Sequence, residues 1–316
     1  MFFWGKCMPY KSSKQDSIDV LTLEWVLHVK NYKLTLDKHR CVGCQICSLV
    51  CPKDAITVEK QFKSGEKALK PNIDVDWTKC NFCGACDITC LFGAISVTIN
   101  GVRNTVLLSK KSYPEINRMI TLDSKECPKD CFECETVCPW KLIKLSRTGF
   151  DGRHIKNVNE LSLTEKRRIK VHVDIQKNYC PTCKICEINC PPKTLKVKKI
   201  FEGKISINTD KCPYNCHDCA DVCPIPNVLI VNSAGKIDIN ELHCIYCGAC
   251  KTVCPIPEAL LLKRTKVTHK RVHSGTWNKT LEKLTSKQDG IRELKAVTSI
   301  KKRNVITKRL KDETDT

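Results

Sequence analysis

The hydrophobic pattern of this 316-residue chain consists of short segments, and none is long enough to cross a membrane. Short runs alternate apolar and polar positions or are rich in β-branched residues, as half-buried strands are. Strands are predicted at 32–36, 55–58, 73–75, 94–97, 228–231 and 237–239, with hairpin turns at 202–204 and 233–236. A small strand-containing unit therefore repeats along the chain, which predicts an α+β fold.

Helices are expected in two further stretches. Residues 143–169 include a polar, helical run that ends at 165–168, and the region after 276 has apolar residues at helical spacing: Trp277, Leu281, Leu284, Ile291 and Leu294. The insertion at 143–169 and the linker at 98–121 either serve docking between subunits or have no function. The C-terminal helix is either solvated or a clamp on a partner protein.

Cysteines occupy the loops between the predicted strands. Of the 25 cysteines, 24 fall into six quartets, four of them spaced C-x2-C-x2-C-x3-C and two with one extra residue in the first gap. The regular quartets are Cys41, Cys44, Cys47, Cys51; Cys80, Cys83, Cys86, Cys90; Cys180, Cys183, Cys186, Cys190; and Cys244, Cys247, Cys250, Cys254. The longer ones are Cys127, Cys131, Cys134, Cys138 and Cys212, Cys216, Cys219, Cys223. Cys7 lies outside them and is expected to be a free thiol.

This spacing is typical of [4Fe–4S] clusters. Three thiolates at two-residue spacing wrap around one cubane, and in two-cluster ferredoxins the fourth cysteine binds the other cluster. Proline follows the fourth cysteine in every quartet except the second, where Leu91 stands and leaves the turn in doubt. Gly43, Gly84 and Gly248 lie inside the loops, where the lack of a side chain lets backbone amides approach the cluster. Six [4Fe–4S] clusters are therefore predicted.

Consecutive pairing of the quartets is the simplest arrangement, although the short gaps between quartets allow others. It divides the ligands into six sets: Cys41, Cys44, Cys47 with Cys90; Cys80, Cys83, Cys86 with Cys51; Cys127, Cys131, Cys134 with Cys190; Cys180, Cys183, Cys186 with Cys138; Cys212, Cys216, Cys219 with Cys254; and Cys244, Cys247, Cys250 with Cys223. The prediction is a tandem array of three bacterial-type two-[4Fe–4S] ferredoxin modules with a basic, partly helical C-terminal tail. Its parts are an N-terminal segment 1–30, module 31–100, linker 101–120, module 121–200, module 205–264 and tail 265–316.

Other uses of these cysteines fit less well. Zinc sites need two well-separated ligand pairs, and a disulfide framework belongs to short secreted chains. No secretory signal precedes the first quartet, so a reduced, cytoplasmic setting is expected. His39, His217 and His243 lie next to cluster loops and are candidates for tuning the potential rather than for ligation. No catalytic or nucleotide-binding motif is present in the sequence, so the chain is predicted to move electrons without a catalytic site of its own.

The net charge of +20 first suggests nucleic acid as a partner. Each cluster with its four thiolates adds about −2, so a chain loaded with six clusters carries roughly +8. Half of the formal charge lies in the tail, where residues 261–316 hold 16 Lys/Arg against 6 Asp/Glu. A cluster-stabilised nucleic-acid-binding protein, and an iron-storage protein, remain alternatives of another class.

Beyond the cysteines, the sequence resembles the polyferredoxin subunit of the archaeal formylmethanofuran dehydrogenases of the tungsten or molybdenum type. The resemblance covers most of residues 32–285 and rests on segments 83–87, 92–95, 99–101, 113–115, 127–131, 245–250, 263–265 and 274–277. It implies that the 24 quartet cysteines are cluster ligands. Members of this family can have more quartets than this chain, which could mean a different docking partner.

The resemblance also implies a function and partners. The chain would relay electrons to or from the metallopterin site of a complex that reduces CO2 or oxidises the formyl group. Its partners would be a metallopterin subunit, a small ferredoxin-like subunit, and a soluble ferredoxin or heterodisulfide reductase as the electron partner. A polyferredoxin of a hydrogenase or heterodisulfide reductase complex is the main alternative.

Overall fold

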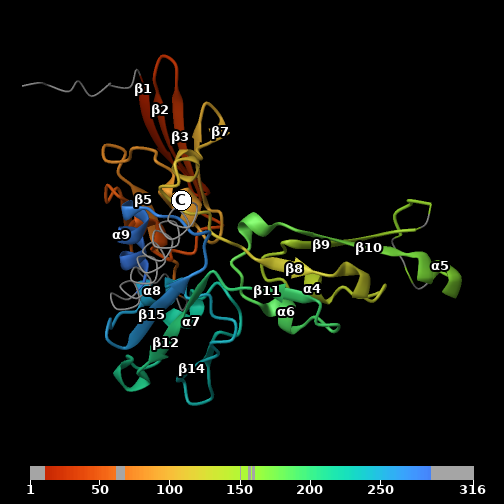
Figure 1. Ribbon diagram of the computed structural model, residues 1–316. Helices are drawn as coiled ribbons and strands as arrows, with labels where there is room; N and C mark the ends of the chain where they lie inside the picture. The colour runs from red at the N-terminus through yellow and green to blue at the C-terminus, as the bar shows by residue number, and fades with distance from the viewer. Residues whose placement is uncertain (1–10, 62–67, 150, 156–157, 159–160, 286–316) are drawn as a thin grey trace, which may run out of the picture.

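The computed structural model describes residues 11–61, 68–149, 151–155, 158 and 161–285 (Figure 1). The N-terminal aromatic residues, Cys7, Ile291, Leu294 and the basic end of the tail therefore lie outside the described residues. Within them, one arrangement of two outer strands, an inner hairpin and two short helices occurs three times. We call these the first unit (residues 31–99), the second unit (120–197) and the third unit (201–267).

In the first unit, the outer strands β3 (Asn31–Asp37) and β6 (Ile95–Ile99) pair antiparallel. The inner hairpin joins β4 (Ile56–Glu59) to β5 (Asn72–Val75), and the two helices are α1 (Ile46–Val50) and α2 (Ala85–Thr89). Three added strands widen the outer pair into a sheet of order β1-β2-β3-β6-β7, namely β1 (Lys11–Asp16), β2 (Val20–Val26) and β7 (Val102–Arg103). The predicted N-terminal segment is thus partly a sheet extension.

The second unit has the same plan. Its outer pair is β8 (Ile120–Leu122) with β11 (Leu195–Val197), and its inner pair is β9 (Ile143–Thr148) with β10 (Lys170–Ile175). Its helical turns are η1 (Ser124–Glu126), α4 (Glu133–Thr136), α5 (Leu163–Arg168), η2 (Lys177–Tyr179) and α6 (Ile185–Ile188). The helical run predicted near 165–168 is confirmed as α5. This helix begins with a capping box between Ser162 and Glu165. The β9–β10 arm and α5 extend away from the rest of the molecule (Figure 1).

The third unit pairs β12 (Phe201–Ile207) with β15 (Leu260–Val267) and β13 (Leu229–Val231) with β14 (Ile237–Ile239). Its helical turns are η3 (Thr209–Lys211), α7 (Asp218–Asp221) and α8 (Ala249–Val253). In the described part of the chain, two helices lie outside the three units: α3 (Val106–Ser109) and α9 (Gly275–Leu284).

The predicted strands are confirmed, but one predicted turn is wrong. Residues 202–204 lie inside β12, where the register shifts between Glu202 and Gly203 opposite β15. A Cβ on Gly203 would come within 2.3 Å of the carbonyl oxygen of Lys263. Glycine therefore marks a close approach of two strands here, which a turn signal in the sequence does not distinguish. The turn at 233–236 is observed between β13 and β14.

The tail helix was predicted to be solvated or a clamp on a partner, and the structure corrects this. Trp277, Leu281 and Leu284 are buried in α9 and belong to one apolar core with residues of the first and third units. The Trp277 ring packs edge-on against Tyr113 at 5.6 Å between centroids, and the Tyr113 hydroxyl lies 2.8 Å from that of Thr280. The apolar stripe of α9 thus covers α1 of the first unit and the segment around Tyr113 that follows this unit.

The apolar cores distinguish the second unit from the other two. One core spans the first and third units together with α9 and takes in Cys183 and Ile185 of the second unit, and another core fills the sheet of the first unit. The separate core of the second unit consists of Ile120, Cys190, Leu195 and Val197. Such a small core implies that the cysteine groups supply much of the cohesion there. Among the described residues, none of the helices has the length and apolar character to cross a bilayer.

Candidate iron–sulfur sites

Each cysteine loop of the regular spacing winds through two residues in the left-handed region. They are Gly43 and Gln45 in the first loop, Phe82 and Gly84 in the second, Thr182 and Lys184 in the fourth, and Tyr246 and Gly248 in the sixth. For non-glycine residues this backbone costs roughly 1–3 kcal/mol and persists only where the surroundings enforce it. The sequence analysis found the three glycines and missed the five other residues, because only glycine announces a positive φ in a sequence.

The left-handed turns direct backbone amides toward the sulfur atoms. The Tyr246 N–H donates to Cys244 Sγ at 3.4 Å. The same donation, from the residue two positions on, holds down the pKa of Cys41, Cys80 and Cys180, in each case against a larger rise caused by burial. Amides that face a sulfur stabilise negative charge on a bound cluster. The loops thus provide the donors that an anionic cluster needs.

The three glycines have a second role, which is close packing. A Cβ on Gly43 would lie 2.5 Å from Pro71 Cδ, and one on Gly84 would lie 3.3 Å from the Asn104 carbonyl oxygen. At Gly248 the neighbours would be Arg264 Nη2 at 3.0 Å and the Cys44 carbonyl oxygen at 3.6 Å. The last pair belongs to two different units, so Gly248 lies where the first and third units meet.

The turn after the fourth cysteine does not depend on proline. Cys51, which precedes Pro52, has φ −67° and ψ 117°, and Cys90, which precedes Leu91, has φ −66° and ψ 117°. In both turns the amide four residues on donates to the cysteine sulfur, from Ala55 at 3.3 Å and from Ala94 at 3.2 Å. The leucine in the second quartet therefore leaves the local turn unchanged.

Two cavities reveal which cysteines face one another. A narrow pocket in the second unit is lined by Cys138 together with Cys180, Cys183 and Cys186. A narrow pocket in the third unit is lined by Cys223 together with Cys244, Cys247 and Cys250. In both, three cysteines of one quartet meet the fourth cysteine of the preceding quartet. The other lining residues are mostly apolar, so the cysteines face surroundings of low polarity.

Electrostatic coupling between thiols repeats this crossing elsewhere. Burial raises the pKa of Cys41, and the charge of Cys90 adds to the rise. Burial likewise raises the pKa of Cys134 to about 11, and the charges of Cys131, Cys127 and Cys190 add to it. Burial raises the pKa of Cys219 to about 12, with Cys254 as the next cause. In each case the fourth cysteine of one quartet lies near one of the first three cysteines of the quartet before it.

The spacing of the sulfur atoms fits a cluster better than a single zinc ion. Zinc–sulfur bonds of 2.3 Å in a tetrahedron place the sulfurs roughly 3.8 Å apart. No cysteine group among the described residues has three or more donor atoms within 4.8 Å of one another. Because each thiolate of a cubane binds a different iron, its sulfurs stand farther apart than those of a zinc site.

Metal-free, these thiols favour their neutral form. Burial is the leading cause of the raised pKa of Cys186 and Cys223, each to about 12, and of Cys244, to about 11. Four thiolates in an apolar cavity are therefore costly unless a cationic core neutralises part of their charge. An iron–sulfur core supplies that charge, and these residues would hold it through four sulfur bonds at each site.

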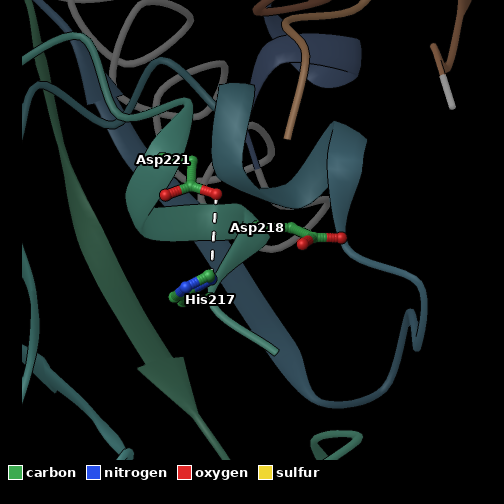
Figure 2. A group of neighbouring side chains, drawn as sticks. All are labelled: His217, Asp218 and Asp221. Carbon is green, nitrogen blue, oxygen red and sulfur yellow. Dashed lines mark ion pairs between the residues drawn. The ribbon is translucent and has the colours of Figure 1, made fainter. Parts of the chain in front are cut away.

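The three histidines singled out in the sequence have different neighbours. His39 Nε2 lies 2.7 Å from Asp19 at the surface, and His243 Nδ1 lies 3.3 Å from the carbonyl oxygen of Cys183 in the second unit. His217 Nδ1 faces Asp221 at 3.8 Å across α7, as Figure 2 shows. With Asp218 these two form a group of ligand-type side chains, but they are partly exposed and flank Cys216 and Cys219. We assign them to the surroundings of the fifth quartet.

Comparison with known proteins gives consistent results. A family model described as a 4Fe-4S dicluster domain matches residues 40–94, and a second model of the same description matches residues 204–255. Among curated proteins, subunit I 2 of the NADH-quinone oxidoreductase of Geobacter metallireducens is 33% identical over 66 residues, 21% of this chain and 50% of that protein. The polyferredoxin-like subunit of an aliphatic sulfonate oxidoreductase of Pyrococcus furiosus is 27% identical over 97 residues, 28% of this chain and 56% of that protein. The matches thus span about half the length of these relatives.

A solved structure matches over nearly the whole chain. It is a chain of the formate dehydrogenase–heterodisulfide reductase–formylmethanofuran dehydrogenase complex from Methanospirillum hungatei, with a TM-score of 0.73 and 30% identity. The match covers 88% of this chain and 92% of that chain, so the two belong to one family. Together with the two dicluster domains and the cysteine loops, this makes the protein a polyferredoxin-like [4Fe–4S] protein of the electron-transfer type.

Proposed function

We propose that the chain holds six [4Fe–4S] clusters in three ferredoxin modules and relays electrons to or from the metallopterin site of a formylmethanofuran dehydrogenase complex. The observation that carries this proposal is the crossing of the quartets in the two cysteine-lined pockets. The crossing is the arrangement that two-cluster ferredoxins use. The modules would occupy about 31–100, 121–200 and 205–264, with the outer strands of the third extending over 201–267.

Six ligand sets follow from the crossing, and we number them as sites. Site 1 is Cys41, Cys44, Cys47, Cys90; site 2 is Cys80, Cys83, Cys86, Cys51; site 3 is Cys127, Cys131, Cys134, Cys190; site 4 is Cys180, Cys183, Cys186, Cys138; site 5 is Cys212, Cys216, Cys219, Cys254; and site 6 is Cys244, Cys247, Cys250, Cys223. A cluster at each site takes up and gives off one electron at a time.

The ligands of sites 1, 4 and 6 lie where units meet, and Lys60 of the first unit also donates to the backbone of Cys254 of site 5 at 2.8 Å. After burial, the charge of Cys247 is the next cause that raises the pKa of Cys44, which couples site 6 of the third unit to site 1 of the first. Arg118 contacts the backbone of both Cys90 and Cys180, which links site 1 to site 4. His243 reaches the backbone of Cys183, which links sites 4 and 6. Sites 2, 3 and 5 would be the outer ends of the route.

The partners follow from the printed name of the matched complex and from the resemblance noted above. We propose that the chain is a subunit without a catalytic site of its own, located in the cytoplasm. It would associate with a metallopterin subunit and a small ferredoxin-like subunit, with soluble ferredoxin or heterodisulfide reductase as the electron partner. The similarity over 88% of the chain to a chain of such a complex supports this assignment.

An anaerobic pull-down of the native chain tests the proposal, with mass spectrometry for partners and elemental analysis for metals. We expect about 24 irons per chain and a metallopterin subunit that carries tungsten or molybdenum. The same iron content with a hydrogenase, and no metallopterin subunit, would refute the complex while leaving electron transfer intact. Far fewer irons, or zinc in their place, would refute the six-cluster assignment.

A further inference from the structure

Arg118 lies between the first and second units and contacts a proposed ligand of each. Its Nη2 donates to the carbonyl oxygen of Cys90 at 2.8 Å and of Leu91 at 3.3 Å, and its Nε donates to the carbonyl oxygen of Cys180 at 3.2 Å. One guanidinium is therefore fixed between site 1 and site 4.

Arg264 has the corresponding position between the first and third units. Its side chain is buried, with 8% of the residue exposed, and it donates to the carbonyl oxygens of Tyr246 at 2.7 Å, Cys247 at 2.6 Å and Leu284 at 3.4 Å. Its Nη2 and the Cys44 carbonyl oxygen approach the same face of Gly248. The guanidinium thus lies between site 6 and the backbone of site 1.

Neither arginine has a carboxylate partner among the ion pairs of the described residues. Burial is the first cause that lowers the pKa of both, and thiols oppose the shift: Cys90 and Cys180 for Arg118, and Cys44 and Cys247 for Arg264. Arginine nevertheless stays charged in proteins. A buried cation needs a counter-charge, and the negative groups that face these two are the cysteine sites on either side.

Lys199 occupies the joint between the second and third units. Its Nζ donates to the backbone carbonyl of Glu241 at 3.0 Å and lies over the ring of Tyr246, between Cys244 and Cys247 in sequence. Burial lowers the pKa of Lys199, while the charges of Cys244, Glu241 and Cys183 oppose this. Each joint between units therefore contains a cation near cysteines of two sites, and Arg40 over the Tyr179 ring and Lys60 at the Cys254 carbonyl oxygen are further cations at these joints.

We propose that Arg118, Arg264 and Lys199 are positioning residues that raise the reduction potentials of the sites meeting at each joint, so that electrons move between units through sites 1, 4 and 6. This inference rests on the proposed function. When one electron leaves a reduced site and enters the oxidised site across the joint, the negative charge of the acceptor increases by one, and the cation stabilises it. The cation also weakens the repulsion between two anionic sites, and no proton has to move because its charge is permanent.

Arg118→Gln tests the proposal because it removes the charge at a half-buried position and retains donors. Redox titration of the loaded protein, followed by EPR under anaerobic conditions, should show the equilibrium constant for reduction at one or two sites lowered by about tenfold, which is about 59 mV for a one-electron couple. Arg118→Lys should keep the equilibrium constants for reduction within about twofold of those of the starting protein. The matched control is Arg153→Gln, whose side chain is 88% exposed and pairs with Asp151. It should leave every potential unchanged.

Iron content and a thermal melt accompany each titration. Unchanged potentials in an Arg118→Gln protein with full iron would overturn the inference, while the iron count of the starting protein judges the proposed function separately. Equal shifts in Arg118→Gln and Arg118→Lys would also overturn it, because hydrogen-bond geometry rather than charge would then be the cause. Should Arg118→Gln fail to load, Lys199→Gln applies the same test at another joint with the same expected shift.

Discussion

Replacing Trp277 by alanine should release α9 from the first unit. The side chain is 1% exposed, packs against Tyr113 and His269, and donates from Nε1 to His269 Nε2 at 3.2 Å. Truncation of a buried tryptophan to alanine costs about 3–5 kcal/mol. Because α9 follows β15 of the third unit but packs on α1 of the first, the loss falls on the contact that joins the two units.

Hydrogen exchange measured by mass spectrometry on the loaded protein reports this loss directly. A decrease of 3–5 kcal/mol in the opening free energy of α9 accelerates exchange of its amides by roughly two to three and a half orders of magnitude, or abolishes their protection. Lys279→Ala is the matched control, since Lys279 is exposed on the same helix. Amides of α9 that exchange within tenfold of the starting rate in Trp277→Ala would refute the docking argument.

Three further predictions follow from the sites and strands. Cys223→Ala and Cys247→Ala should each remove the cluster of site 6, about four of 24 irons. The double variant should lose no more iron than either single variant, and a loss of about eight irons would contradict the crossing. The control variant Cys7→Ser should keep all the iron. Because burial raises the pKa of Cys219 and Cys223 to about 12, protons compete with iron at neutral pH, so iron retained against a chelator should increase from pH 6.5 to 8.5. Because the pKa of these thiols is higher in the folded than in the unfolded chain, any stability that the protonated thiols give the iron-free fold is present below about pH 9 and is lost toward pH 12. Gly203→Ala should lower the free energy of unfolding by about 1–3 kcal/mol because its Cβ meets the Lys263 carbonyl oxygen, whereas Gly275→Ala, with open space around it, should not; equal denaturant midpoints for the two variants would count against this.

Local patterns in the sequence predicted the parts of the fold that local residues determine. Short strands beside a cysteine loop can be read from alternation, and the observed strands β3 to β6, β13 and β14 lie at the predicted positions. The cysteine spacing carries its own geometry, so the positions of the cysteine loops and of their glycines could be anticipated. The left-handed residues Phe82, Thr182 and Tyr246 could not, because the constraint comes from the loop and not from the side chain.

Contacts between residues far apart in the sequence could not be predicted from the hydrophobic pattern. The stripe of α9 indicated a buried face but not its partner, since an apolar face in a sequence does not name the surface that covers it. Gly203 resembled a turn because its strand neighbour, Lys263, is distant in sequence. In the sequence, Arg118 and Arg264 were only two of many basic residues. Their positions between cysteine sites could not be predicted because they depend on which units contact one another.

The packing of α9 on the first unit also sets an order of events during synthesis. Tyr113 and Thr280, whose hydroxyls meet, are separated by 167 residues, so at about 5–20 residues per second the ribosome needs roughly 8–33 s to deliver the second after the first. Throughout that interval the apolar surface around Tyr113 has no cover. The first unit therefore emerges with one side open to assembly factors, and the last described helix closes it.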